Sequence, residues 1–178
     1  GHHYAVDLVK QLDDMNQGHY LDRDLVDAVK TDFCIGVAGY PEKHFEAPNM
    51  ETDLQYLKQK VDAGADYIVT QMFFDNTKYF AFVKSCRDMG INVPIIPGLK
   101  PVYSIKQLTV LPKVFHIDLP TELSGEMIKC KSDEEVEKLG TEWLYHQSVE
   151  LKKSGVPVLH YYTIGKPGVV CDVVKRLQ

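Results

Sequence analysis

The chain has 178 residues, of which 44% are hydrophobic and 25% charged, and its formal net charge is −5. These values are typical of one globular domain with a sizeable core. The negative net charge argues against a general nucleic-acid-binding surface. The chain contains neither an apolar run of roughly 18 residues, as a membrane helix needs, nor a signal-peptide pattern. We therefore expect a cytoplasmic protein with no nucleic-acid or membrane partner.

The cysteines and histidines give no metal-binding pattern. The four cysteines are far apart and form no CxxC pair, which indicates reduced thiols in a cytosolic protein. The seven histidines form no HExxH motif and no cluster with cysteine. No metal site is expected.

The first third of the chain predicts two helices, a strand and a third helix. Apolar residues at helical spacing indicate helices over Tyr4–Met15 and Arg23–Lys30. Phe33–Ala38 is nearly all apolar, as is typical of a strand buried on both faces of a sheet. Asn49 is placed to cap a helix over Met50–Ala63.

The next stretch predicts a buried strand that begins at Tyr67 and ends in polar residues. Thr70 and Gln71 stand at its carboxyl end, where α/β folds bind their ligands. Gln71 is therefore a candidate binding residue, and the alternative is that it caps a neighbouring loop. Asn76 is expected to cap a helix reaching Met89, followed by a short strand over Val93–Ile96.

The last third repeats the strand and helix pattern. The sequence Ser104-Ile-Lys-Gln107 has the form of a capping box, and so does Ser132-Asp-Glu-Glu135. The expected elements are helices over Ile105–Leu111, Glu122–Ile128 and from Ser132 to about Ser154, a strand over Val156–Thr163, and a helix ending near Leu177.

Four strands alternating with helices imply a parallel sheet with right-handed crossovers. A complete (β/α)8 barrel needs about 250 residues, so this chain could supply about half of one. In a parallel sheet, the polar residues that follow each strand converge on one edge, although solvated loops would show the same residue types. These residues are Tyr40, His44, Thr70, Gln71, Asp75, Lys100, Thr163 and Lys166.

One helix face offers a further hypothesis. Asp53, Tyr56 and Lys60 have i, i+3 and i+7 spacing on the helix over Met50–Ala63. Asp53 could accept a hydrogen bond from a sugar or ribityl hydroxyl, and Lys60 could pair with a phosphate. From these residues alone, an ordinary amphipathic surface is the favoured interpretation. No nucleophile–base motif or glycine-rich phosphate loop is present.

Several motifs in the same order along the chain resemble the methylenetetrahydrofolate reductase family. The order of the motifs makes this resemblance more specific than any one of them. It runs from Tyr4 to the C-terminus, with an apparent insertion around Asn16–Asp32. The motifs are Tyr4–Val9, Val37–Pro41 with His44, Ala63–Asp66, Thr70–Asp75, Pro94–Gly98 and Leu159–Thr163.

The resemblance implies a flavin enzyme with a (β/α)8 barrel. Such an enzyme reduces 5,10-methylenetetrahydrofolate to 5-methyltetrahydrofolate. NADH or NADPH donates the hydride, and FAD carries it to the folate. The protein's tasks are to hold the flavin and to stack the nicotinamide and the pterin on it in turn.

The resemblance also assigns residues to the two ligands. Gln71 and Gln107 match glutamines that contact folate, while Lys166 stands where many members have arginine and Leu111 where some have phenylalanine. A lysine can pair with the carboxylate of the folate's glutamate tail but cannot clamp it with two parallel bonds. Tyr56 and Gln59 replace an asparagine and an arginine of some relatives. The positions matched to FAD contacts are Ala5, Tyr40, His44, Ala47, Asp53, Tyr56, Gln59 and Lys60.

One departure limits these expectations. The family's barrel begins about four strands earlier, and its general-acid glutamate and a flavin-tuning Arg-Gly-Asp motif are not matched in this chain. The resemblance therefore describes residues 1–178 as a single partial domain, the C-terminal half of the barrel, with no catalytic residue of its own and little activity alone. A homo-oligomer is expected. The alternatives are a non-catalytic half-barrel that self-associates or binds a partner, and an unrelated small α/β binding domain.

Overall fold

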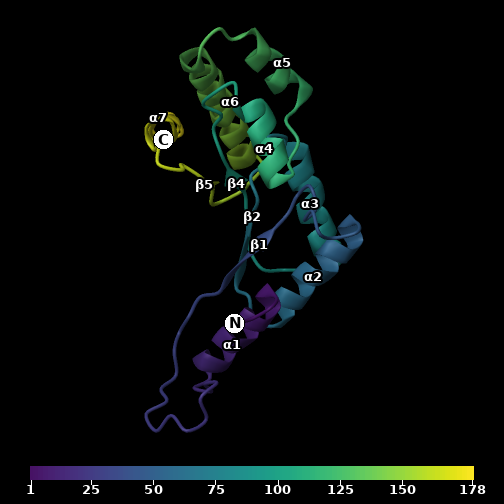
Figure 1. Cartoon of the computed structure of the whole chain (residues 1–178), viewed down its shortest axis with the longest axis vertical. Coiled ribbons are helices and arrows are strands. Elements are labelled where there is room, and N and C mark those ends of the chain that lie inside the picture. Colours follow the sequence, from purple (N-terminus) through teal and green to yellow (C-terminus); the bar gives the residue numbers. More distant parts are fainter.

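The computed structural model describes all residues, 1–178, and shows an α/β fold with seven helices and five short strands (Figure 1). The helices are α1 (Ala5–Asn16), α2 (Met50–Asp62), α3 (Asn76–Asp88), α4 (Gln107–Phe115), α5 (Thr121–Lys129), α6 (Asp133–Lys153) and α7 (Gly168–Arg176). The strands are β1 (Gly36–Gly39), β2 (Tyr67–Thr70), β3 (Ile95–Ile96), β4 (Gly98–Leu99) and β5 (His160–Tyr161).

All strand pairs are parallel, as the alternation of strands and helices predicts. One sheet has the order β1-β2-β3, with Val37 opposite Ile68 and Ile68 opposite Ile95. The second sheet pairs β4 with β5, with Gly98 opposite His160. The carboxyl ends of neighbouring strands consequently lie on a common edge, where their following loops can build a site.

The strand expected over Val93–Ile96 ends before Pro97, as predicted, but it covers only Ile95–Ile96, and an unexpected short strand, β4, follows the proline. Proline has no N–H to donate to a sheet and so marks a break in the pairing. Beyond this break, the backbone N–H of Gly98 donates to Oγ1 of Thr70 at 2.9 Å. The hydroxyl of Tyr162 donates to the carbonyl oxygen of the same threonine at 2.9 Å. Thr70 therefore joins the two sheets where their main-chain pairing stops.

Two buried apolar clusters stabilise the molecule. The larger has 20 residues and joins the sheet to α1, α2, α3, α6 and α7. The smaller has 8 residues and lies among α4, α5, α6 and the segment after β2. Figure 1 shows α4, α5 and α6 at one end of the molecule and α1 with α2 at the other. None of the helices combines the length and hydrophobicity that a membrane crossing requires.

Helix α6 is fixed to the segment that leaves β2. The indole N–H of Trp143 donates to the carbonyl oxygen of Phe74 at 3.1 Å. The side-chain amide of Gln147 donates to the carbonyl oxygen of Phe73 at 3.0 Å. The hydroxyl of Ser132 accepts from the N–H of Glu135 at the start of this helix, as expected. Asn49 caps α2 in the same way, through the N–H of Thr52.

The expected helix over Arg23–Lys30 is wrong. That segment is part of an extended excursion between α1 and β1, visible at the lower end of Figure 1. Its apolar side chains Leu25, Val26 and Val29 are 45%, 93% and 68% exposed, so no surface is present for them to pack against. A helix of this length without tertiary packing is not stable in water.

The strand expected over Phe33–Ala38 covers Gly36–Gly39, and it alternates between exposed and buried residues, so it is not buried on both faces. Three further expected boundaries differ from the structure. Asp75, and not Asn76, caps α3, since its carboxylate accepts from the N–H of Thr77. Helix α4 begins at Gln107, because Gln107 uses its carboxamide oxygen to bind the backbone N–H groups of Tyr103 and Ser104. The last strand is confined to β5, whose only partner is the two-residue β4.

The glycine at the start of β4 permits a close approach that we expect to be essential. A Cβ at Gly98 would lie 2.2 Å from the carbonyl oxygen of Thr70. Gly98→Ala should therefore lower the free energy of unfolding by about 1–3 kcal/mol. Urea denaturation measures this change. Gly125→Ala on α5 is the matched control, because its Cβ would meet no atom within 4 Å. Equal stabilities of the two variants would contradict the expectation.

Candidate functional site

Two clefts lie beside the loops that leave the carboxyl ends of the strands. The larger, here called the α1–α2 cleft, has a volume of about 830 Å³. It is formed by the segment that opens α1, the loop after β1 and one face of α2. The residues that line it are His3, Tyr4, Ala5, Val6, Tyr40, His44, Glu46, Ala47, Asp53, Tyr56, Gln59 and Lys60. All eight positions that the sequence matches to cofactor contacts are in this set.

The loop after β1 is held in place by its own polar groups. The carboxylate of Asp53, which is only 9% exposed, accepts from the backbone N–H of His44 at 2.9 Å. Lys43 adopts a left-handed backbone conformation with φ of 76°. Its ammonium donates to the carbonyl oxygens of His44 and Ala47 at 2.9 and 2.6 Å. The wall of the cleft is therefore formed before any ligand arrives.

Lys60 supplies a cation to this cleft. Its ammonium donates to the carbonyl oxygen of Ala38 at 2.7 Å, which uses one of its three donors. Burial lowers the pKa of this lysine, and the nearby carboxylate of Asp53 opposes that effect. An anionic ligand group would accept from the remaining donors.

Tyr40 forms an aromatic wall together with His44, whose ring lies edge-on at 4.6 Å between centroids. Burial raises the pKa of Tyr40, and the charges of Asp53 and Glu46 raise it further. The phenol is therefore a neutral hydrogen-bonding group at physiological pH.

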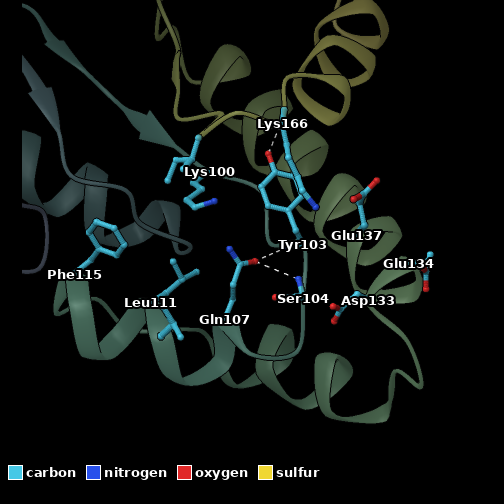
Figure 2. Close-up of a pocket in the computed structure, with 12 residues that line it drawn as sticks. Lys100, Tyr103, Ser104, Gln107, Leu111, Phe115, Asp133, Glu134, Glu137 and Lys166 are labelled. Carbon is cyan, nitrogen blue, oxygen red and sulfur yellow. Dashed lines mark hydrogen bonds between the residues drawn. The ribbon is translucent and has the colours of Figure 1, made fainter.

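The second cleft, here called the α4–α6 cleft, has a volume of about 430 Å³ (Figure 2). Two of the three residues that the sequence matches to folate contacts, Gln107 and Lys166, line it. The full set is Lys100, Tyr103, Ser104, Gln107, Val110, Leu111, Phe115, Asp133, Glu134, Glu137, Ile164 and Lys166.

Gln107 organises the turn before α4, as the capping-box pattern suggests. Its carboxamide oxygen accepts from the backbone N–H groups of Tyr103 and Ser104, which fixes the orientation of the side chain. The amide nitrogen consequently faces into the cleft, toward Lys100, and has no protein acceptor (Figure 2). The residue organises the start of α4 and leaves an unpaired donor in the cleft.

Tyr103 links the opposite sides of the α4–α6 cleft. Its hydroxyl donates to the backbone carbonyl oxygen of Lys166 at 3.0 Å, which ties the loop after β5 to the loop after β4. The ammonium groups of Lys100 and Lys166 lie 4.6 and 5.3 Å from the centre of its ring. In the sequence, Lys100 is one of several polar residues that follow a strand, and no motif marks Tyr103. A lysine among the apolar residues that follow a buried strand was the available signal.

Gln71 lines neither cleft but lies between the strands that lead to them. Its N–H donates to the carbonyl oxygen of Gly39 at the end of β1. Its carboxamide oxygen accepts from the N–H of Met72 at 3.0 Å. The sheet order places β2, which Gln71 follows, next to β1 on one side and to β3 on the other. The carboxamide oxygen thus binds within its own turn and not to a neighbouring loop, and the amide nitrogen is left without a protein acceptor.

Parallel strands whose carboxyl ends lead into two polar clefts define a ligand-binding α/β domain. The family model described as methylenetetrahydrofolate reductase matches residues 1–178, and the chain belongs to this family.

Curated relatives agree with this assignment. The chain is 37% identical over 147 residues to a probable methylenetetrahydrofolate reductase (NADPH) of Caenorhabditis elegans, covering 82% of this chain and 22% of that protein. It is 39% identical over 146 residues to the 5,10-methylenetetrahydrofolate reductase of Salmonella typhimurium, covering 80% of this chain and 49% of that protein. The chain thus spans between a fifth and a half of the length of these relatives.

A solved structure supports the fold. A protein from Clostridium thermocellum, described as binding two copies of 5-methyl-5,6,7,8-tetrahydrofolic acid, matches with a TM-score of 0.54 and 19% identity. The match covers 83% of this chain and 55% of that protein. At this level of identity, the similarity establishes a shared α/β architecture.

The electrostatic coupling in the α1–α2 cleft can be measured directly. Asp53→Asn removes one of the charges that raise the pKa of Tyr40, so we expect that pKa to fall while burial keeps it above 10.0. NMR titration of the tyrosine ring carbons, assigned with Tyr40→Phe, gives the value. Glu46→Gln should produce a smaller decrease, and Glu51→Gln, which is exposed on the same helix, should produce none. An unchanged pKa in Asp53→Asn would show that the two groups are not coupled.

Proposed function

We propose that the protein takes part in the NAD(P)H-dependent, FAD-mediated reduction of 5,10-methylenetetrahydrofolate to 5-methyltetrahydrofolate. The observation that carries the proposal is the convergence of eight residues matched to FAD contacts in one cleft of about 830 Å³. That volume lies within the range of about 300–1,000 Å³ that is usual for cofactor and small-molecule sites. Relatives named for NADPH and for NADH support a nicotinamide donor of either kind.

The residues of the α1–α2 cleft fit the chemistry of FAD. Asp53 presents a fixed carboxylate that can accept from a ribityl or ribose hydroxyl. Lys60 presents an ammonium with free donors for the pyrophosphate. The rings of Tyr40 and His44 supply an apolar and aromatic wall. When bound, FAD supplies the group that accepts a hydride from the nicotinamide and passes it on.

The remaining polar residues fit the folate. Gln71 has a free amide nitrogen that can donate to a pterin or a nicotinamide carboxamide, and Gln107 has another that points into the α4–α6 cleft. Lys166 can pair with a carboxylate of the glutamate tail. Leu111 supplies an apolar contact at the floor of this cleft. In this proposal, the chain's own residues bind and orient both ligands, while none of them acts as a general acid.

The proposal therefore concerns a protein in which the rest of a (β/α)8 barrel accompanies these residues and supplies the acid. For residues 1–178 alone, as a partial domain, we expect little or no turnover. We also place the protein in the cytoplasm, because its four cysteines are free.

A second candidate is a non-catalytic domain that associates with itself, and one observation favours it. Leu21, Val26 and Val29 are 74%, 93% and 68% exposed on the excursion between α1 and β1. An apolar surface of this kind is typical of an interface. Light scattering combined with FAD titration distinguishes the candidates. A monomer that binds FAD supports catalysis alone, and an oligomer that does not bind FAD supports the non-catalytic domain.

Flavin binding tests the assignment of the α1–α2 cleft. We expect Lys60→Met to weaken FAD binding about 10–100-fold, because a charge-assisted hydrogen bond is worth roughly 1.5–3 kcal/mol. Quenching of flavin fluorescence on titration with protein measures the dissociation constant. Gln55→Leu, on the exposed face of α2, is the matched control and should bind FAD normally. Failure of the unmodified protein to bind FAD would overturn the proposed function.

Gln71 tests the folate assignment. Gln71→Leu removes the free amide donor at nearly constant volume, so we expect about tenfold weaker binding of 5-methyltetrahydrofolate, the value of one or two neutral hydrogen bonds. FAD binding should remain within about twofold of normal. Calorimetry with each ligand measures both affinities. Equal loss of both affinities would indicate damage to the fold, and loss of neither would remove Gln71 from the site.

A further inference from the structure

Lys100 is a buried cation without a counter-ion. Its side chain is 3% exposed, and its ammonium makes one long hydrogen bond, of 3.3 Å, to the carbonyl oxygen of Pro101. An ammonium group has three donors, so two remain unused. A charge buried without a partner is unfavourable unless something compensates for the water it has lost. The fold alone therefore does not explain why this ammonium group is buried.

A second cation makes the arrangement less favourable still in the free protein. Lys166 enters the same α4–α6 cleft from the loop after β5 and faces the ring of Tyr103, as Lys100 does (Figure 2). Burial lowers the pKa of Lys100, and the charge of Lys166 lowers it further. The ring of Tyr103 attracts both cations but does not neutralise either of them.

The acidic residues of the cleft do not compensate these charges. Asp133, Glu134 and Glu137 project from α6 on the opposite wall, and none forms an ion pair with Lys100 or Lys166. Asp133 instead accepts from the backbone N–H of Ile105 at 3.0 Å, which helps to fix the turn before α4. The two ammonium groups are therefore available to an anion that enters the cleft.

The donors in the cleft match one chemical class of ligand. Figure 2 shows the ammonium of Lys100 directed toward the space beside Gln107, whose amide nitrogen is also free. Two cations and one amide donor that line one cleft suit a ligand that carries two carboxylates.

We propose that Lys100 is a second cationic anchor that, together with Lys166, makes the α4–α6 cleft selective for a dicarboxylate ligand. The inference rests on the proposed function, in which this ligand is the glutamate tail of the folate. One carboxylate pairs with Lys166 at the exposed mouth of the cleft, and the other pairs with Lys100 deeper inside. Binding is strengthened because the dianion relieves the repulsion between the two ammonium groups.

The test compares two probes that differ in one carboxylate. p-Aminobenzoyl-L-glutamate carries two carboxylates and p-aminohippurate carries one. We expect the unmodified protein to bind the first more tightly, and Lys100→Met to reduce that preference at least tenfold. The control is Lys106→Met, an exposed lysine next to α4 that does not line the cleft, and it should leave the preference unchanged.

Thermal unfolding separates a binding role from a structural one. Because Lys100 is a buried charge without a partner, Lys100→Met should raise the Tm of the free protein, by about 2–4 °C, while it weakens binding of p-aminobenzoyl-L-glutamate. A lowered Tm would identify Lys100 as a structural residue and overturn the proposal. A raised Tm with unchanged probe preference would also overturn it.

The same measurements keep this proposal distinct from the proposed function. Suppose that 5-methyltetrahydrofolate binds, but p-aminobenzoyl-L-glutamate has the same affinity for the unmodified protein and for Lys100→Met. The proposed role of Lys100 is then wrong, and the folate function stands. If the two-carboxylate probe binds in a Lys100-dependent way and folate does not bind, the dicarboxylate subsite is supported and the folate function fails. If neither ligand binds, both are overturned.

Discussion

The hydrogen bonds of Thr70 are the constraint on which the rest of the structure depends. This residue is fully buried at the end of β2, where the main-chain pairing with β3 has already stopped. Its hydroxyl accepts from Gly98, which starts β4, and its carbonyl oxygen accepts from Tyr162, which follows β5. Because buried polar groups require partners, these bonds fix the second sheet against the first. The relation between the two clefts follows from that connection.

Each cleft is shaped by side chains that bind nearby backbone rather than a ligand. Lys43 and Asp53 hold the loop after β1, and Gln107 and Tyr103 hold the loops after β4 and β5. These residues consume the polar groups of the loops, so the donors that remain are few and specifically placed. Lys60 in one cleft, and Lys100, Lys166 and the amide nitrogen of Gln107 in the other, keep donors that no protein group uses. A site of this kind is preorganised, because its walls do not have to rearrange when a ligand binds.

The charges in the two clefts are unevenly compensated. Lys60 lies near the carboxylate of Asp53, which partly offsets its burial. Lys100 has only another lysine and an aromatic ring beside it. The first arrangement is stable without a ligand, whereas the second gains most from an anion. Lys60 therefore has a partly structural role, whereas the burial of Lys100 is favourable mainly when an anion is bound.

The sequence by itself determined the order of the elements, apart from the helix expected over Arg23–Lys30, and it determined the parallel pairing and the family. Helix caps at Asn49 and Ser132, the apolar strand before Tyr40 and the collinear motifs are local features, and local chemistry suffices to predict them. It also determined which residues are candidates for the α1–α2 cleft, through motifs matched position by position.

Only the tertiary structure decided where those residues meet and which of them are free to bind. The segment Arg23–Lys30 has the pattern of a helix, yet it lacks a surface on which to pack, and no local rule reveals that absence. The strand before Pro97 is predicted, but the pairing of Gly98 and Leu99 with β5, far along the chain, is not. Lys100 is one more lysine in the sequence, and its significance arises from burial beside Tyr103 and Lys166, contacts made by residues brought together by the sheet. Long-range packing sets the cost of a buried charge, so the sequence could mark Lys100 as a candidate but could not show that it is buried.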